Sequence, residues 1–175
     1  AQGQKVVHCH GVFDLLHIGH IRHLSEARKM GDVLVVTITP DRFVNKGPSR
    51  PAFGENLRAE AIAALDCVDY VAINQWPTAV EAIRLLCPNY YVKGMEYSDN
   101  GNDRTGGIVP EEQAVQSVGG ELAFTDDITF SSSTLINQHL SAFPKEVSEW
   151  LSGFSGRYSS GDVLSYLDNS RSAKV

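Results

Sequence analysis

Gly11-Val-Phe-Asp-Leu-Leu-His17-Ile-Gly-His20 is the stretch that decides the fold, because it joins an apolar segment to an amphipathic one. Lys5–His10 (KVVHCH) has the character of a strand, and Ile18–Met30 has apolar residues at helical spacing before Gly31. Gly11 permits a tight turn and the close approach of a phosphate, and the start of the helix offers N–H groups to an anion. This order predicts an anion-binding site where the strand passes into the helix.

Two histidines in this stretch are the candidate catalytic residues. His17 and His20 are three positions apart, so both can face the same side of the helix start. Gly19 between them leaves room for a nucleotide against the backbone, and Asp14 is expected to fix the loop or to orient a histidine or a metal-bound water. Two imidazoles beside a helix dipole can stabilise the charge that develops on an α-phosphate under attack.

A zinc site is the competing interpretation of the same region, because Cys9 lies between two further histidines. Side chains alternate along a strand, so His8 and His10 point away from Cys9. A structural zinc site needs three or four converging ligands. The spacing therefore favours the phosphate site, and we expect no protein-held metal.

Strands and helices are predicted to alternate along most of the chain. A buried strand is expected from the β-branched run at Asp32–Thr39, and ligands of such sheets bind at the carboxyl ends of the strands. The order β-α-β-α-β predicts an α/β fold with a doubly wound parallel sheet. The further elements expected are helices at Gly54–Leu65 (with Leu57, Ala61, Ala64 and Leu65 on one side), Pro77–Cys87 (with Pro77 in its first turn), Val109–Val118 and Ser131–Leu140, and strands at Val68–Ile73, Tyr90–Val92 and Glu121–Phe124.

The pattern changes after Leu140, so we expect a domain over residues 1–140 and a helical tail over 141–175. Short helices are predicted at Pro144–Leu151 and Ser160–Leu167, with the glycines and serines of Gly153–Ser159 as a linker. The end of the sequence resembles the start of another strand, which leads us to expect a further domain downstream.

Composition limits the possible partners. Hydrophobic residues make up 42% and charged residues 21%, which is typical of a globular protein, and no run of about 18 apolar residues is present. The net charge of −6 argues against a partner bound along a nucleic-acid backbone. Cys9, Cys67 and Cys87 have no metal-type spacing and are interpreted as small buried hydrophobes, for which a reducing cytoplasm is the expected location.

The motif Gly11–His20 resembles the signature of the cytidylyltransferase-like (HxGH) nucleotidyltransferase superfamily, and the resemblance extends from about Lys5 to Leu140. It is strongest to the adenylyltransferase domain of bifunctional heptose kinase/adenylyltransferases and to glycerol-3-phosphate cytidylyltransferases. The resemblance implies a Rossmann-like fold, transfer of a nucleoside monophosphate with release of pyrophosphate, and Mg²⁺ bound mainly through the nucleotide phosphates. It also implies a homodimer.

Later motifs extend the resemblance to the nucleotide site. Lys46, in a loop after the second strand, is similar to the family's triphosphate-binding lysine, although a solvated loop lysine is the simpler interpretation of the residue alone. Arg58 in Glu55-Asn-Leu-Arg58 is expected to reach the phosphates, unless it is a surface arginine. The residues that the resemblance assigns to the nucleotide are Gly11, Val12, Phe13, Asp14, Gly19, Arg58, Gly94, Ser131, Ser132, Ser133 and Thr134.

The segment expected to bind the acceptor is Tyr91-Val-Lys93-Gly94-Met-Glu96-Tyr97, which is similar to the V-K-G-x-D-Y motif of the heptose adenylyltransferases. Glu96 stands where that motif has aspartate. Lys93 is expected to hold the acceptor's phosphate or a sugar hydroxyl, and His10 contacts the acceptor or is neutral variation.

The leading functional hypothesis is transfer from ATP to a heptose-like sugar 1-phosphate. A CTP-dependent enzyme acting on glycerol 3-phosphate, or on another alcohol or sugar phosphate, is the alternative. A nucleotide-binding module without turnover is a remote third, and a dinucleotide enzyme is disfavoured because no G-x-G-x-x-G follows the first strand. The heptose enzymes of this family are often fused to a sugar kinase, which would suit the expected downstream domain.

Overall fold

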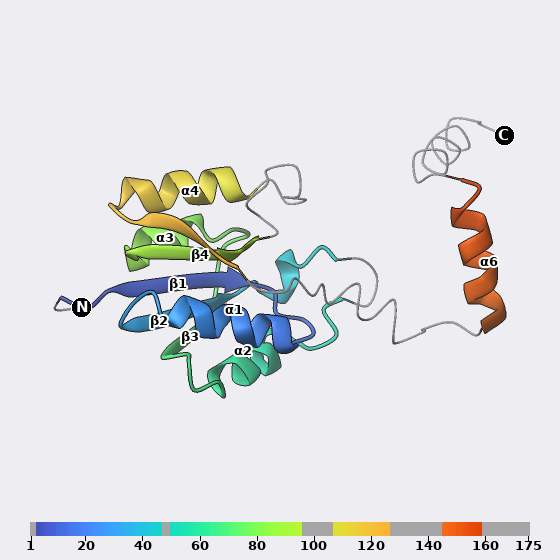
Figure 1. Ribbon diagram of the computed structural model, residues 1–175, viewed down its shortest axis with the longest axis horizontal. Helices are drawn as coiled ribbons and strands as arrows, with labels where there is room; N and C mark the ends of the chain where they lie inside the picture. Colours follow the sequence, from blue (N-terminus) through green and yellow to red (C-terminus); the bar gives the residue numbers. More distant parts are fainter. Residues whose placement is uncertain (1–2, 47–49, 96–106, 127–144, 159–175) are drawn as a thin grey trace. The chain divides into compact units, whose positions relative to one another are not determined.

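The computed structural model describes residues 3–46, 50–95, 107–126 and 145–158 of the chain. Its core is a sheet of five parallel strands in the order β3-β2-β1-β4-β5 (Figure 1). The strands are β1 (Val6–Gly11), β2 (Val33–Ile38), β3 (Tyr70–Ile73), β4 (Tyr90–Gly94) and β5 (Glu121–Thr125). The predicted doubly wound parallel sheet is confirmed.

β1 lies at the centre of the sheet, and this position explains where the site forms. The chain adds β2 and β3 on one side of β1 and then returns to add β4 and β5 on the other. The strand order therefore reverses between β1 and β4, where loops leaving the carboxyl ends diverge and leave room for a ligand. Gly11 ends β1 at this edge and pairs with Ile38, the last residue of β2.

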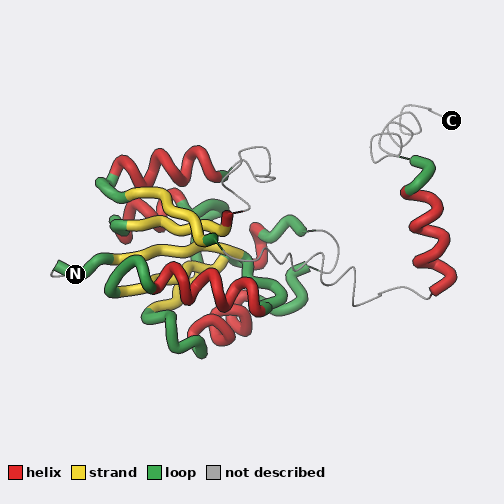
Figure 2. Tube along the Cα trace, viewed as in Figure 1, coloured by secondary structure: helices red, strands yellow, loops and turns green. Residues whose placement is uncertain are grey.

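Helices cover both faces of the sheet (Figures 1 and 2). α1 (Ile18–Arg28) and α2 (Glu55–Ala63) pack on one face, and α3 (Val80–Leu86) and α4 (Ile108–Ser117) pack on the other. Two apolar clusters follow from this arrangement, because alternate residues of each buried strand face opposite helices. The first is built around Val7, Cys9, Leu24, Val36 and Val92, and the second around Ala79, Ile83, Tyr91, Ala114 and Val115.

α2 turns a different side to the sheet from the one predicted. Leu57, Ala61 and Ala64 are exposed, and the fully buried residues of the helix are Arg58 and Ile62. Of the four residues predicted to face the sheet, only Leu65, just beyond the helix, packs against the core. Counting apolar residues missed this rotation, because an arginine with many hydrogen bonds decides which face is buried.

α3 begins later than predicted, with Ala79 at its N-cap, so Pro77 lies before the helix. The Asn74 side chain explains the delay. Its amide nitrogen donates to the carbonyl oxygens of Trp76, at 3.0 Å, and Thr78, at 2.7 Å, and holds the intervening segment in a turn. Those carbonyls therefore point back toward Asn74.

The prediction that the cysteines are small buried hydrophobes holds for Cys9, holds in part for Cys67, which packs against the same apolar cluster, and is wrong for Cys87. Cys9 is buried in the core, Cys67 is half-buried, and Cys87 is exposed. Cys87 is the C-cap of α3, with a φ of 44°. A helix end is a surface position, and this takes the residue out of the core despite its apolar neighbours.

Contacts divide the chain into Ala1–Ser132 and Ser133–Val175. The second unit contains α6 (Lys145–Ser155), which continues through Gly153 and corrects the linker predicted from that position onward. Aromatic rings four residues apart, Trp150, Phe154 and Tyr158, stack along it with centroids 5.1 and 5.0 Å apart. The helices predicted at Ser131–Leu140 and Ser160–Leu167 fall outside the described residues. Within the described ranges, no helix is long and apolar enough to cross a membrane.

Candidate active site

His17 and His20 form a stacked pair at the start of α1. Their ring centroids are 3.8 Å apart, with 27° between the ring planes. His17 is the N-cap residue, and its Nδ1 accepts a hydrogen bond from the backbone N–H of Gly19 at 3.1 Å. The Nδ1 of His20 reaches back and accepts from the backbone N–H of His17 at 3.3 Å. The pair is thus held in place by the capping of the helix itself.

This cap also determines which ring nitrogen carries the proton. A neutral imidazole has one donor and one acceptor nitrogen, so an accepting Nδ1 leaves the proton on Nε2. Burial, together with the charges of His17, Lys46 and His23, lowers the pKa of His20 to about 3. His20 is therefore neutral at physiological pH and presents an Nε2–H donor, which is the group that an anionic phosphate oxygen requires.

The Phe13 side chain packs against His20. Phe13 is buried, and its ring meets the His20 ring edge-on, with centroids 5.4 Å apart. Phe13 adopts a φ of 51°, and a Cβ on Gly11 would lie 3.1 Å from its ring. Any larger residue at position 11 would press on the Phe13 ring, so glycine favours the packing of Phe13 against His20.

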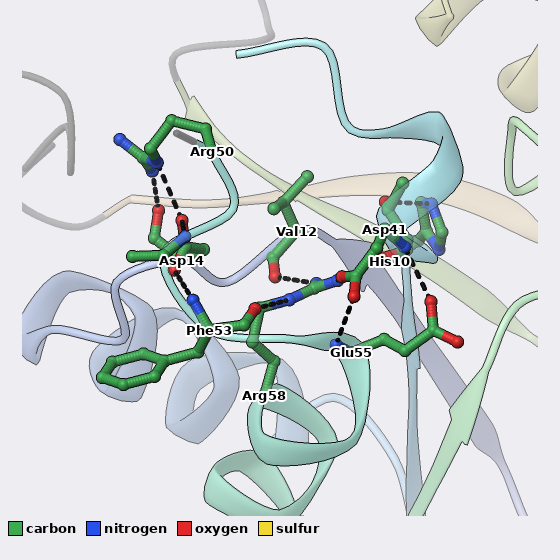
Figure 3. A network of polar contacts seen from close by, with 10 residues as sticks. His10, Val12, Asp14, Asp41, Arg50, Phe53, Glu55 and Arg58 are labelled. Carbon is green, nitrogen blue, oxygen red and sulfur yellow. Dashed lines mark hydrogen bonds and ion pairs between the residues drawn. The ribbon is translucent and has the colours of Figure 1, made fainter. Parts of the chain in front are cut away.

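Asp14 holds the loop at residues 50–53 against the turn that follows β1 (Figure 3). Its carboxylate accepts from the Nε of Arg50 at 2.8 Å and from the backbone N–H groups of Ala52 at 2.9 Å and Phe53 at 3.2 Å. Burial acts to raise the pKa of Asp14, but these hydrogen bonds outweigh it and lower the pKa. Of the roles expected for Asp14, the geometry favours fixing the loop.

Arg58 lies inside the same network (Figure 3). Its side chain is 1% exposed and donates to four groups. These acceptors are the carbonyl oxygens of Phe53 (2.9 Å), Val12 (2.6 Å) and Thr39 (2.8 Å) and the carboxylate of Asp41 (2.7 Å). The guanidinium ties the turn after β1 to the end of β2, and this geometry favours a scaffold role over direct contact with phosphates.

Lys46 lies in the loop after the short helix Asp41–Phe43. Partial burial, with the charge of Arg50 nearby, lowers its pKa, whereas the charge of Asp14 acts in the opposite sense. The Lys46 charge also contributes to the lowered pKa of His20. The structure therefore brings this lysine within electrostatic range of the histidine pair, as a triphosphate-binding role requires.

His10 lies between two threonines at the carboxyl edge of the sheet. Its Nδ1 is 2.8 Å from the hydroxyl of Thr37, and its Nε2 is 3.1 Å from the hydroxyl of Thr39. The Nε2 of His8 contacts the same Thr37 hydroxyl at 2.8 Å. Hydroxyl groups can both donate and accept, so this chain of hydrogen bonds orients both imidazoles, while burial, with the charge of Lys93 nearby, lowers the pKa of each and keeps it neutral.

Lys93 makes an ion pair that the sequence did not indicate. Its ammonium lies 2.9 Å from Oε2 of Glu111 on α4, and the two side chains are 14% and 6% exposed. The hydroxyl of Tyr91 donates to the same oxygen at 2.9 Å, and the backbone N–H of Ala79 donates to Oε1 at 3.3 Å.

The remaining predicted residues divide into two groups. Val12 and Gly19 belong to the turn and helix start after β1, and Gly94 ends β4 beside Thr125. Glu96 and the hydroxyl run Ser131–Thr134 lie outside the described residues.

Sequence reasoning gave no role to two site residues, Arg50 and Glu111. Arg50 follows Lys46 in the same loop, and nothing in the sequence indicates that Asp14, 36 residues earlier, is its partner. Glu111 had no signal, because one acidic residue near a helix start is common.

Buried neutral histidines predict a loss of stability in acid. Burial, with Lys93 nearby, lowers the pKa of His8 to about 3, that of His23 to about 4, and that of His10 well below its ordinary value. The unfolded chain binds protons near pH 6.5, so stability is fully present above that pH and is lost as the pH falls toward 4. We expect the melting temperature to drop steeply between pH 6.5 and 5.

Thermal unfolding followed by circular dichroism at pH 7.5, 6.5, 5.5 and 5.0 tests this expectation. Each buried neutral histidine contributes up to about 1.4 kcal/mol per pH unit in this range. His10→Gln should flatten the pH dependence by about one proton. A melting temperature that is constant from pH 7.5 to 5.0 contradicts the assignment.

A parallel α/β sheet with a polar carboxyl edge and an anion-binding helix start defines a nucleotide-binding class of domain. Residues 8–139 match the cytidylyltransferase-like family. The chain belongs to this family, and its domain is that of a nucleotidyltransferase.

Relatives agree with this assignment. The bifunctional protein HldE of Pelobacter propionicus is 39% identical over 138 residues, covering 78% of this chain and 27% of that protein. HldE of Aliarcobacter butzleri is 42% identical over 112 residues, covering 63% of this chain and 23% of that protein. The chain thus spans roughly a quarter of the length of these curated relatives.

A solved structure supports the same fold. The lipopolysaccharide core biosynthesis protein from Thermoplasma volcanium superposes with a TM-score of 0.60 at 26% identity. The match covers 73% of this chain and 100% of that chain. The family and the Rossmann-like fold expected from the sequence are confirmed.

Proposed function

We propose that the domain transfers a nucleoside monophosphate from ATP to a sugar 1-phosphate of the heptose type and releases pyrophosphate. The observation that carries this proposal is the stacked pair of His17 and His20 at a helix N-terminus, with Lys46 in electrostatic range. His17 and His20 lie together at the helix start, and the charge of Lys46 acts on His20, so we infer that hydrogen-bond donors and positive charge converge here on a bound triphosphate. A triphosphate placed there would receive donors at its α-phosphate and a cation toward its leaving end.

The chemistry needs no covalent enzyme intermediate. A phosphate oxygen of the acceptor attacks the α-phosphorus and forms a new P–O bond, while the bond between the α-phosphorus and the bridging oxygen breaks. Pyrophosphate leaves with that electron pair. The attacking oxygen is already ionised, so no general base is required. His17 and His20 donate to the α-phosphate oxygens, and Lys46 stabilises the charge on the leaving group.

A divalent cation, which we take to be Mg²⁺, would accompany the nucleotide and neutralise phosphate charge. The described ranges hold no cluster of three or more His, Cys, Asp or Glu side chains able to bind a metal ion. Asp14 in particular already accepts three hydrogen bonds. The donor set therefore fits a cation bound mainly through substrate phosphates.

The choice of ATP and a heptose-like acceptor rests on similarity. The relatives are HldE proteins, and the Lys93-Gly94 segment resembles the heptose adenylyltransferase motif. CTP with glycerol 3-phosphate remains the second candidate, because the match is to a cytidylyltransferase-like family.

The proposal extends to partners. The relatives carry the name "bifunctional" and are much longer than the match, which supports a nucleotidyltransferase domain working beside a second activity such as a sugar kinase. We also propose a homodimer, and this proposal rests on the family resemblance alone.

Release of pyrophosphate tests the proposed reaction. ATP and CTP are each combined with heptose 1-phosphate and with glycerol 3-phosphate in the presence of Mg²⁺. We expect a signal with ATP and the sugar phosphate that exceeds the other three pairs by at least about tenfold, because an unmatched polar group in the acceptor pocket costs more than 1 kcal/mol.

A signal with CTP alone would replace the substrate assignment and leave the mechanism in place. Nucleotide binding by calorimetry without turnover in any pair would contradict the proposed substrates. Absence of both binding and turnover would contradict the nucleotide site itself.

A further inference from the structure

Lys93 is the cation on the β1–β4 side of the site, and its counterion is buried. Glu111 is 6% exposed in its side chain, and its carboxylate accepts from Lys93, from the Tyr91 hydroxyl and from the backbone N–H of Ala79. These partners come from β4 and from the cap of α3, so they fix the carboxylate from several directions. The ammonium also lies 5.3 Å from the centroid of the Tyr91 ring.

The sheet register places this ion pair beside His10. Cys9 of β1 pairs with Val92 of β4, and His10 and Lys93 each follow that pair directly along their strands. Alternation puts both on the face that carries His8 and Tyr91. His10 and its threonine partners therefore line one neighbourhood with the Lys93–Glu111 pair.

The electrostatic surroundings of His10 and Lys93 differ from those of the His17–His20 pair. Lys46 acts electrostatically on His20, whereas Lys93 acts on His10 and His23. Burial and Lys93 keep the pKa of His10 well below its ordinary value, so its imidazole is neutral. Among the described residues of this neighbourhood, Lys93 and Glu111 compensate each other's charge, and His10, Thr37 and Thr39 add neutral hydrogen-bonding groups.

A phosphate would bind poorly in such a place. To engage a dianion fully, Lys93 would have to leave Glu111, and breaking a buried ion pair leaves an uncompensated charge. A hydroxyl needs only one of the three N–H donors of an ammonium and leaves the pair intact. Neutral imidazole and threonine hydroxyls are likewise suited to hydroxyl groups.

We propose that Glu111 is a specificity-determining, positioning residue: it neutralises and fixes Lys93, so that this end of the acceptor pocket binds the hydroxyl groups of a sugar and not a phosphate. This inference rests on the proposed function and deepens it. The acceptor's own phosphate lies toward His17, His20 and Lys46, and its polyhydroxyl part lies against Lys93 and His10. Glu111 acts through Lys93 and does not touch the substrate.

The test compares Glu111→Gln, Lys93→Met and the double variant with wild type. Glu112→Gln is the matched control, because it removes a carboxylate one residue away whose partner is Gln116 on the same helix. The first readout is calorimetric binding of inorganic phosphate to the enzyme saturated with α,β-methylene ATP. The second is KM and kcat with heptose 1-phosphate.

In Glu111→Gln we expect phosphate to bind about 10-fold more tightly and the KM for the sugar phosphate to rise about 10-fold, with kcat little changed. The double variant should lose the gain in phosphate binding. Lys93→Met should raise the same KM and leave phosphate binding as in wild type. Glu111→Asp, which keeps the charge, should restore a KM near that of wild type.

Unchanged phosphate binding and KM in Glu111→Gln would overturn the inference. So would weaker phosphate binding in Lys93→Met, because Lys93 would then already bind phosphate in the native protein. Thermal unfolding confirms that each variant is folded. If Glu111→Gln does not fold, phosphate binding to Lys93→Met still tests whether Lys93 is compensated in the native protein. Calorimetry needs no turnover, so a wild-type enzyme inactive toward sugar phosphates would count against the proposed function and not against the role of Glu111.

Discussion

Replacing His17 with asparagine should lower kcat by about 10²- to 10³-fold while leaving the melting temperature close to that of wild type. Asparagine is a favoured N-cap residue, and its side-chain oxygen can accept the Gly19 N–H that Nδ1 of His17 accepts in the structure. It cannot replace the Nε2–H on the far side of the ring. The substitution therefore separates capping of α1 from stabilisation of the α-phosphate.

His17→Ala completes the comparison, since it removes the cap and the donor together. We expect a similar loss of kcat and a further loss of about 1 kcal/mol in the free energy of unfolding. His23→Gln is the control, because His23 lies on the same helix and contacts Thr125 at 2.7 Å. Retention of most of the wild-type kcat in His17→Asn would remove the histidine pair from the mechanism.

Arg58→Met should lower the free energy of unfolding by about 3–5 kcal/mol, as expected when one partner of a buried charged network is removed. The guanidinium supplies the hydrogen bonds observed at the carbonyl oxygens of Val12 and Thr39 and pairs with Asp41. Methionine fills the space but donates nothing to these groups. Arg58→Lys should rescue little, because one ammonium cannot reproduce a planar fork.

Urea denaturation measures the effect, with Arg84→Met as the matched control. Arg84 pairs with Glu81 on the surface of α3, and its side chain is 55% exposed, so its loss should cost less than about 1 kcal/mol. If Arg58→Met is as stable as the control but binds ATP much more weakly, Arg58 contacts the nucleotide directly, as the sequence interpretation had it.

The sequence was sufficient for the fold because the signals are local. Each strand is a short, mainly apolar run, and Gly11 ends β1 as expected. α1 ends at Arg28 with Lys29 as its C-cap, which is earlier than the end predicted at Met30 and Gly31. A Cβ on Gly31 would lie 2.7 Å from Cγ2 of Val7, which gives this glycine a packing reason. The spacing of His17 and His20 also predicted their shared orientation, since residues three apart on a helix are neighbours.

Where prediction failed, long-range polar contacts decided the structure. The orientation of α2 depends on Arg58, whose acceptors include Val12 and Thr39. The late start of α3 depends on how Asn74 holds the preceding turn. Neither effect can be predicted from the spacing of apolar residues. A side chain with several hydrogen bonds can determine the orientation or the start of a helix against its apolar pattern.

The residues expected to bind the acceptor show the same difference between local sequence motifs and long-range contacts. Lys93 could be singled out from its neighbours in the motif, but its ion pair joins β4 to α4 across a segment of chain with no recognisable signal. Only the structure shows that Lys93 is compensated by Glu111. The charge of the acceptor pocket is therefore a property of the fold and not of the motif.

The central claim is that an acceptor phosphate oxygen attacks the α-phosphorus at the histidine pair. Heptose 1-phosphate labelled with ¹⁸O in its phosphate, incubated with ATP, Mg²⁺ and either wild type or His17→Asn, tests this by mass spectrometry of both products. The account predicts that all of the label appears in the sugar nucleotide and none in pyrophosphate, at a rate strongly reduced in the variant. Label in pyrophosphate, or a sugar nucleotide formed equally fast without His17, would contradict it.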